Sequence, residues 1–526
     1  MRCSLLSSVL LALVPSVAAQ VVVDEAETNI TTDCVEADAF DPNFDYFEGL
    51  KYAVTDYTPE LVSDLGTDAF EDNKVNLDGT TDLFSITYHN HYKILTNHQM
   101  NKTYLLYMCG TQEQIPTEEL EAGKHHLVLS IPHTGGVAIT QTTQIPYMEL
   151  LGLRREIIAY IGDPQYITSP CLLHLINEEN SVELVYDRDD PWNSTSTAAL
   201  QAEFLEEHPD AIVLGGPFHD PDGDRSVIVL ATQERTTVAT FDWIGFYAAF
   251  FNLESMSNQI AADTKARFDC SASNAATLSA NREEQPKVLW ATYYQSYNWS
   301  VVQCPTWDSA YYCEYASHCG AEIISRPEGY GQTVNGYWYL NDEQFVELGK
   351  DADIFILASL GDKIYEQKKE ALDQLKAVQN EQFYDTYGQG QHTWHEQRLA
   401  EYDVVALDFC DVVGTASNTG TGEAHTRRWL RNVLKEPMGS LPACNVPDDI
   451  DEPYVAIGAA CSPLEEASAS TNTAADDNRE VSGEDNNDVS GGGNSDALGA
   501  ASKGFSLAFA GAWVFVLISS VLSIAM

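Results

Sequence analysis

The sequence predicts an α/β fold in which two lobes are joined by a single long helix. Two stretches, residues 125–216 and 287–379, alternate apolar strand-like runs with amphipathic helices, which is typical of a mainly parallel sheet covered on both faces. Between them, residues 241–268 carry apolar side chains that can line one stripe of a helix. No repeat with a period of roughly 20 to 50 residues is present, so solenoids and propellers are excluded.

The N-terminal lobe is predicted to span residues 20–240. Residues 80–110 alternate as strand, turn and strand, and they predict an antiparallel hairpin inserted into this lobe. A strand at 125–131 precedes a Gly/Thr-rich loop at 132–144, and a helix starts near Pro146. A further strand, an amphipathic helix and a buried strand that ends in glycines complete the lobe.

The C-terminal lobe is predicted to span residues 286–461, after a bridging helix region at 241–285. Its expected elements are strands at 287–294, 351–359 and 402–410 and an amphipathic helix at 362–379. Both lobes are then Rossmann-like. Because such sheets bind ligands at the carboxyl ends of their strands, we expect the ligand to lie between the lobes.

The first nineteen residues have the anatomy of a secretory signal. Arg2 precedes an apolar run from Leu5 to Val14, and small residues at 17–19 predict cleavage before Gln20. The mature protein is therefore expected outside the cytosol.

The other end of the chain predicts a membrane attachment. Residues 462–500 are acidic and rich in small polar residues, so we expect a disordered stalk. Residues 501–526 carry an apolar run, and the small residues around Ser495 predict a glycosylphosphatidylinositol (GPI) signal with the lipid on Ser495. A transmembrane anchor is the alternative. Both place the folded part at the cell surface or in the secretory pathway.

The cysteines and sequons agree with secretion. Of eleven cysteines, ten remain once Cys3 is removed with the signal, and an even number in an oxidising compartment predicts disulfides. The sequence does not show which cysteine is bonded to which. Potential glycosylation sites are Asn29, Asn101, Asn193 and Asn298.

The net charge and the absence of common catalytic motifs make two classes of function less favourable. With 28 Lys and Arg against 79 Asp and Glu, the net charge is −51, which disfavours nucleic-acid binding. The Gly-rich nucleotide loops, the nucleophile elbow and H-E-x-x-H are absent from the sequence, which weakens an enzymatic interpretation.

Two segments are candidates for ligand contact. The loop 132–144 could offer free N–H groups and hydroxyls to an oxyanion or polar ligand, or it could be a glycine-permitted turn with a threonine cap. The aromatic residues from Tyr293 to Trp307 could stack on a bulky chelate, and their phenolates suit ferric iron. Alternatively, they form a core or glycan-flanked cluster beside Asn298.

Histidine pairs suggest a different chemistry. His89 and His91 are two residues apart, a spacing that points both rings to one face of a strand, as a metal site needs. No third ligand can be assigned, so the polar face of a hairpin is the favoured explanation of the pair. His392 and His395 have a similarly ambiguous spacing.

These segments resemble the periplasmic solute-binding proteins of the ferric siderophore, haem and cobalamin class. The similar segments include TTQIPYMELLGLRREIIAYIG, LQAEFLEEHPDAIVLG and TFDWIGFYAAFFNLESMSNQIA, followed by KVLWATYY and DADIFILAS. The resemblance covers about residues 80–410. The hairpin, the cysteines, the sequons and the tail depart from the bacterial members, so the chain resembles a eukaryotic cell-surface version, as in iron-acquisition proteins of algae.

The resemblance implies binding of a metal chelate, most of all a ferric siderophore, without catalysis and without a tightly bound cofactor. It also implies uptake partners such as a membrane transporter or a reductase. The implied ligand-binding residues are Pro132, His133, Thr134, Gly135, Thr140, Gln141, Thr142, Gly216, Phe218, Tyr293, Tyr294, Trp299, Trp307 and Ser359.

Other functions stay open at this point. Cobalamin and haem are alternative ligands on the same fold. A secreted metal-dependent enzyme would use His89, His91 or His133 as metal ligands, and an adhesive wall protein would need no cleft.

Overall fold

The computed structural model describes residues 34–36, 38–48, 73–76, 81–190, 193–217, 219, 222–223, 225–304, 310–334, 337–417, 425–456 and 461–464. The predicted signal peptide, nearly all of the predicted stalk and the apolar tail lie outside these residues, as do Asn29, Phe218, Trp307 and Ser495. None of the helices in the described ranges combines the length and the apolar character that a membrane span needs.

The first sheet contains the segment predicted as a hairpin, which forms three strands instead of two. Its order is β1 (Phe84–Tyr88), β2 (Tyr92–Asn97), β3 (Lys102–Met108) and β4 (Leu127–Ile131). The first three strands are antiparallel, whereas β4 runs parallel to β3. The strand predicted at 125–131 therefore extends the hairpin sheet instead of starting the sheet of the lobe.

The second sheet is parallel throughout and forms the centre of the N-terminal lobe. Its order is β7 (Glu183–Val185), β6 (Ile157–Ile161), β5 (Val137–Ile139), β8 (Ile212–Gly215) and β9 (Ser226–Ile228). The loop predicted at 132–144 is wrong in its middle, because β5 is the central strand. All three residues of β5 are buried, but so short an apolar run between glycines and threonines shows no strand period.

Helices cover this sheet. They are α1 (Ile145–Leu150), α2 (Pro170–His174) and α3 (Ser194–Glu207). Pro146 stands in the first turn of α1, where its missing N–H costs nothing. The Asn193 side chain accepts hydrogen bonds from the N–H groups of Thr195 and Ser196 and so caps α3.

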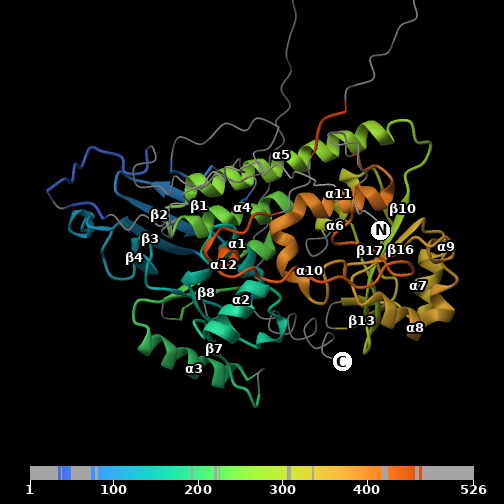
Figure 1. Cartoon of the computed structure of the whole chain (residues 1–526), viewed down its shortest axis with the longest axis horizontal. Helices are drawn as coiled ribbons and strands as arrows, with labels where there is room; N and C mark the ends of the chain where they lie inside the picture. The colour runs from blue at the N-terminus through green and yellow to red at the C-terminus, as the bar shows by residue number, and fades with distance from the viewer. Residues whose placement is uncertain are drawn as a thin grey trace, which may run out of the picture.

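Two helices replace the single helix expected at 241–268. Helix α4 (Thr237–Ala248) ends before Asn252, whose φ of 57° breaks the helix, and α5 (Glu254–Ser279) then continues for 26 residues. At 1.5 Å per residue α5 is about 39 Å long. It follows the parallel sheet and precedes the third sheet, packing against α4 and α11 and running along one edge of the molecule (Figure 1).

The third sheet belongs to the C-terminal lobe. Its main order is β11 (Asn298–Val301), β10 (Lys287–Tyr294), β15 (Ile354–Leu357), β16 (Phe383–Asp385) and β17 (Arg431–Asn432), and β12 (Glu322–Ile323) also pairs with β10. The inner strands are parallel, and β11 and β17 are antiparallel edges. A separate hairpin joins β13 (Gln332–Val334) to β14 (Tyr337–Tyr339).

The helices of this lobe include one that was predicted as a strand. They are α6 (Ala310–His318), α7 (Asp342–Gly349), α8 (Gly361–Leu372), α9 (Lys376–Gln379), α10 (Thr393–Glu396), α11 (Tyr402–Val413) and α12 (Asp448–Asp451). The prediction of a strand at 402–410 is wrong. Helix α11 is buried around nearly its whole circumference, so its apolar run lacks the one-sided pattern of a surface helix.

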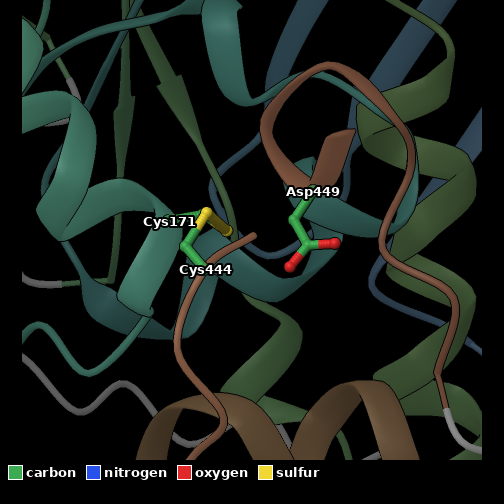
Figure 2. A group of neighbouring side chains, drawn as sticks. All are labelled: Cys171, Cys444 and Asp449. Atoms are coloured by element: carbon green, nitrogen blue, oxygen red, sulfur yellow. A yellow bond between two sulfur atoms is a disulfide. The ribbon is translucent and has the colours of Figure 1, made fainter. Parts of the chain in front are cut away.

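The ten predicted disulfide cysteines are all paired. The pairs are Cys34–Cys109, Cys171–Cys444, Cys270–Cys461, Cys304–Cys313 and Cys319–Cys410. Cys171 lies in α2 of the N-terminal lobe, whereas Cys444 begins a segment, residues 444–456, that we call the C-terminal strap (Figure 2). The strap follows the third sheet in sequence and returns to the N-terminal lobe, where α12 packs against the turn Arg154–Glu156 that follows α1 (Figure 1).

The strap is also held by hydrogen bonds. The Arg154 guanidinium donates to the backbone carbonyls of Asp449 and Glu452 at 2.5 and 2.6 Å. The backbone N–H of Tyr454 donates to the carbonyl of Glu149 at 2.7 Å. The two lobes are therefore tied both covalently and by buried polar contacts.

We expect the Cys171→Ser/Cys444→Ser double variant to lose more stability than Cys304→Ser/Cys313→Ser. The first bond joins residues 273 positions apart and the second only 9, and chain entropy makes the longer loop the stronger constraint on the unfolded state, by about 3 kcal/mol. Guanidinium unfolding of both variants measures the difference. Equal losses would mean that the bond between α2 and the strap adds no constraint of its own.

Candidate functional site

A pocket lies between elements of the two lobes. One wall comes from residues that follow β5 and β9 and from α4, and the other comes from α6, α10 and the turn that leads into α11. Its volume is about 180 Å³. It is lined by Thr143, Thr232, Glu234, Arg235, Thr236, Thr237, Thr240 and Phe241 from the first wall and by Tyr311, His395, Arg398, Leu399 and Tyr402 from the second.

Arg398 is the most unusual group in the pocket. Its guanidinium lies 4.4 Å from the centre of the Tyr311 ring and 5.2 Å from that of Trp394. Within the part of the chain that the structure describes, it donates no hydrogen bond and forms no ion pair, and its Nε is buried without an acceptor. Aromatic faces attract a cation but accept no conventional hydrogen bond from it. A charged donor is thus left available.

His395 presents a neutral imidazole to the same pocket. Desolvation lowers its pKa to about 4, and the charges of Arg398 and His392 contribute in the same direction. The side chain nevertheless retains exposed surface, which we assign to the pocket that it lines. At neutral pH the ring therefore has one nitrogen that donates and one that accepts.

Two carboxylates lie close to the pocket but are engaged elsewhere. Glu234 accepts a hydrogen bond from the Trp243 indole at 2.9 Å and one from Thr81. Glu314 accepts from the Thr237 backbone N–H at 2.7 Å and from its hydroxyl at 2.5 Å. Burial raises the pKa of both carboxyl groups. Neither is an ion-pair partner of Arg398.

A third carboxylate holds the lobes together beside the pocket. Glu396, the last residue of α10, accepts hydrogen bonds from the backbone N–H groups of Thr168 and Ser169 at 2.9 and 2.8 Å. These N–H groups lie at the start of α2 in the other lobe. The Gln397 amide donates to the same carboxylate at 2.6 Å. Complete burial raises the pKa of Glu396 to about 8, with a further contribution from Glu149.

The first-lobe residues predicted to bind ligand fall into two groups at opposite ends of β5. Thr140, Gln141, Thr142 and Gly216 gather at its carboxyl end, next to Thr143 of the pocket. There the Thr140 hydroxyl donates to the Leu214 carbonyl at 2.9 Å, and a Cβ on Gly216 would lie 2.0 Å from the Gln141 amide. A side chain at position 216 would therefore have to displace the side-chain amide of Gln141.

The second group precedes β5 and lies away from the pocket. It consists of Pro132, His133, Thr134 and Gly135. His133 is 5% exposed, its backbone N–H donates to the Phe250 carbonyl at 2.8 Å, and a ring nitrogen lies 3.1 Å from the Gly136 carbonyl. His133 is thus a hydrogen-bonded core residue in this structure.

The predicted aromatic residues of the C-terminal lobe also separate. Trp299 is fully buried, stacks on Phe345 at 4.0 Å and donates its indole N–H to Asp342 at 2.8 Å, so the core interpretation describes its environment. Tyr293 and Ser359 lie where β10 and β15 end, and the backbone N–H of Tyr293 donates to the Ser359 hydroxyl at 3.1 Å. Neither these two nor Tyr294 lines the pocket.

The histidines proposed as metal ligands are not brought together with a third ligand. His89 stacks on Tyr92, with ring centres 4.3 Å apart, and a ring nitrogen of His91 lies 3.2 Å from the Gln114 carbonyl. Both residues lie in the turn between β1 and β2 rather than on one strand face.

Two groups of three potential metal-binding side chains occur among the described residues, and neither contains His89, His91 or His133. The first is Cys171, Cys444 and Asp449, but its sulfur atoms are bonded to each other (Figure 2). Because a disulfide has no thiolate to offer a metal, this first group is not a metal site. The second group is Glu183, Glu207 and His208, of which the two glutamates are exposed and His208 is partly buried.

We expect Arg398→Met to leave the free energy of unfolding of the ligand-free protein unchanged or raised, because it removes a desolvated charge that no acceptor compensates. Arg267→Met is the matched control, since Arg267 forms a buried ion pair with Asp403 at 2.7 Å and its loss should cost about 3–5 kcal/mol. Denaturant unfolding measures both. A large loss for Arg398→Met would show that the guanidinium stabilises the fold.

We expect the unfolding free energy of the wild type to fall relative to Glu396→Gln as the pH rises from about 4.5 to 8. The carboxyl group has a pKa of about 8 when folded and 4.5 as its ordinary value, so in this range the folded protein holds a proton that the unfolded chain has lost. The slope cannot exceed about 1.4 kcal/mol per pH unit. Exposed Glu366→Gln is the control, and identical slopes in both variants would contradict the raised pKa.

Comparison with known proteins finds similarity in structure but not in sequence. No family model and no curated protein matches the sequence. Among solved structures, a periplasmic heme-binding protein from Pseudomonas aeruginosa is 12% identical, with a TM-score of 0.37, covering 56% of this chain and 96% of its own.

Two further similar structures have other ligands. The vitamin B12 binding protein BtuF of Vibrio cholerae is 12% identical, with a TM-score of 0.35 and coverage of 54% and 97%. The siderophore binding protein BauB, solved with two molecules of acinetobactin and ferric iron, is 14% identical, with a TM-score of 0.36 and coverage of 53% and 92%. These structures are of the class that the sequence resembles.

Proposed function

We propose that this chain is a non-catalytic, cell-surface solute-binding protein that captures a metal chelate, a ferric siderophore in the first instance, and presents it for uptake. The observation that carries the proposal is the pocket between the lobes, whose walls come from residues 143–241 and 311–402. A site built from both lobes at the carboxyl ends of their strands is the usual position of a ligand in open α/β sheets.

The composition of the pocket supports binding of a polar ligand. It presents an uncompensated guanidinium, a neutral imidazole and several threonine hydroxyls, together with aromatic surface from Tyr311 and Phe241. These groups suit a ligand with oxygen-rich arms around an apolar body. The five disulfides agree with an extracellular location. The anchor at Ser495 and an uptake transporter or reductase are parts of the proposal that rest on the sequence.

The size of the pocket limits how the ligand sits. A volume of about 180 Å³ is below the roughly 300–1,000 Å³ of pockets that enclose a whole small molecule. A siderophore would therefore insert one arm into the pocket and extend beyond it, or the lobes would separate to admit more.

Haem is a second candidate because His395 stays neutral in the pocket. Its pKa of about 4 keeps a ring nitrogen free to coordinate iron at any physiological pH, and histidine is a common axial ligand of haem. Cobalamin has no comparable observation in its favour.

The test is a fluorescence titration of the full-length protein in detergent with a ferric siderophore, its iron-free form, haem and cobalamin. Trp394 lies beside Arg398, so a ligand in the pocket should quench its emission, saturating at one ligand per protein. Ferric siderophore should bind much more tightly than the iron-free form. Saturation by haem alone would change the ligand, and absence of saturation with every compound would contradict the proposed function.

A Trp394→Phe variant shows where the signal comes from. It should lose most of the quenching but retain the affinity for the ferric chelate, measured by equilibrium dialysis with radioactive iron. Trp299→Phe is the matched control, because Trp299 packs in the core against Phe345 and does not line the pocket; it should keep the quenching.

A further inference from the structure

We propose that the pocket recognises a single ionised carboxylate, so that the preferred ligands are ferric chelates that carry a free carboxylate rather than neutral trihydroxamates. This inference rests on the proposed function and names the chemical class of its ligand. Its basis is the environment of Arg398.

A desolvated cation without a partner is costly, and most buried arginines of this chain have one. Arg154 pairs with Glu149 at 3.0 Å, Arg267 with Asp403 at 2.7 Å and Arg431 with Asp385 at 2.8 Å. Arg398 has only aromatic faces around it. Because the guanidinium fork matches the geometry of a carboxylate, a bound carboxylate would supply the missing counter-charge and acceptors.

The side chains that surround Arg398 do not supply a counter-charge to its guanidinium. Tyr311, Tyr312 and Tyr315 approach from α6, Tyr147 from α1 and Trp394 from α10. Tyr147 donates its hydroxyl to the Thr240 carbonyl at 2.7 Å. Of the carboxylates near the pocket, Glu234 accepts from Thr81 and Trp243, and Glu314 accepts from Thr237. No carboxylate among the described residues forms an ion pair with the guanidinium.

Further donors line the same space. The hydroxyls of Thr143 and Thr232 have no hydrogen-bond partner among the residues that the structure describes, and both line the pocket. The exposed Arg235 adds a second positive charge on the first wall. Together with the His395 ring, these groups could donate to the oxygens of an anion that Arg398 binds.

Charge and size favour a carboxylate over a phosphate. The Arg398 guanidinium balances one negative charge, the opposite charges of Arg235 and Glu234 in the pocket wall offset each other, and the net charge of −51 opposes a dianion. The pocket of about 180 Å³ admits one small arm of a chelate. A planar, singly charged group at the end of such an arm meets both conditions.

The experiment compares the affinities of the full-length protein for three probes: a ferric α-hydroxycarboxylate siderophore with a free carboxylate, its methyl ester at that carboxylate, and a neutral ferric trihydroxamate. We expect the wild type to bind the free acid at least tenfold more tightly than the other two. Arg398→Met should bind acid and ester equally. Arg188→Met, which removes an exposed arginine remote from the pocket lining, should keep the preference.

The outcomes separate this inference from the proposed function. Equal binding of acid and ester by the wild type, or an unchanged preference in Arg398→Met, would overturn the carboxylate site while solute binding stands. Failure of all three chelates to bind the wild type would overturn both. Thr143→Val with Thr232→Val, which leaves the charges unchanged, should weaken binding of the acid more than that of the ester, and the reverse would count against the site.

Discussion

The contact between the lobes beside the pocket is the constraint on which the candidate site depends. Glu396 receives the backbone N–H groups of Thr168 and Ser169 across this contact, and the C-terminal strap adds the Cys171–Cys444 bond. The walls also pack on each other directly, because the rings of Phe241 and Tyr402 have their centres 5.1 Å apart. Since the opposite walls of the pocket belong to different lobes, these contacts together set the separation between Arg398 and the threonines of the other wall.

The same contact explains why the electrostatics of this region are unusual. Closing the lobes removes water from Glu396, Arg398 and His395 together, which raises the pKa of the carboxyl group and lowers that of the imidazole. Backbone N–H groups donate hydrogen bonds to the Glu396 carboxyl group, whereas no acceptor in the described chain pairs with the Arg398 guanidinium. Glu396, which has hydrogen-bond partners in the other lobe, therefore acts as a structural contact, whereas Arg398, which has no acceptor, is available to a ligand.

Much of the fold could be predicted from the sequence, because alternating strands and helices leave a clear periodic pattern. The errors have physical causes. Strand β5 is too short to show a period, and α11 is buried on nearly all sides, so neither has the pattern of its element type. Asn252 interrupts the predicted helix in a left-handed backbone conformation that the neighbouring residues do not indicate.

The site was harder to predict than the fold. The glycines and threonines of the loop 132–144 indicate residues such as Thr142, and the spacing from His392 indicates His395, but a role of either in binding stays a prediction. Arg398 belongs to no motif, because its significance comes from the absence of a partner, and absence is visible only once the chain has folded. Trp299 is among the residues predicted to bind ligand because it is aromatic and follows a strand, although it packs in the core against Phe345.

The two disulfides that flank the strap also determine how mechanical load would pass through the protein. Cys444 is bonded to α2 and Cys461 to α5, so both ends of the segment between them are fixed. Tension applied to the chain beyond residue 464 would reach Cys461 first, where the disulfide transfers part of it to the 26-residue helix α5. The load that reaches the strap through the backbone is reduced by that part.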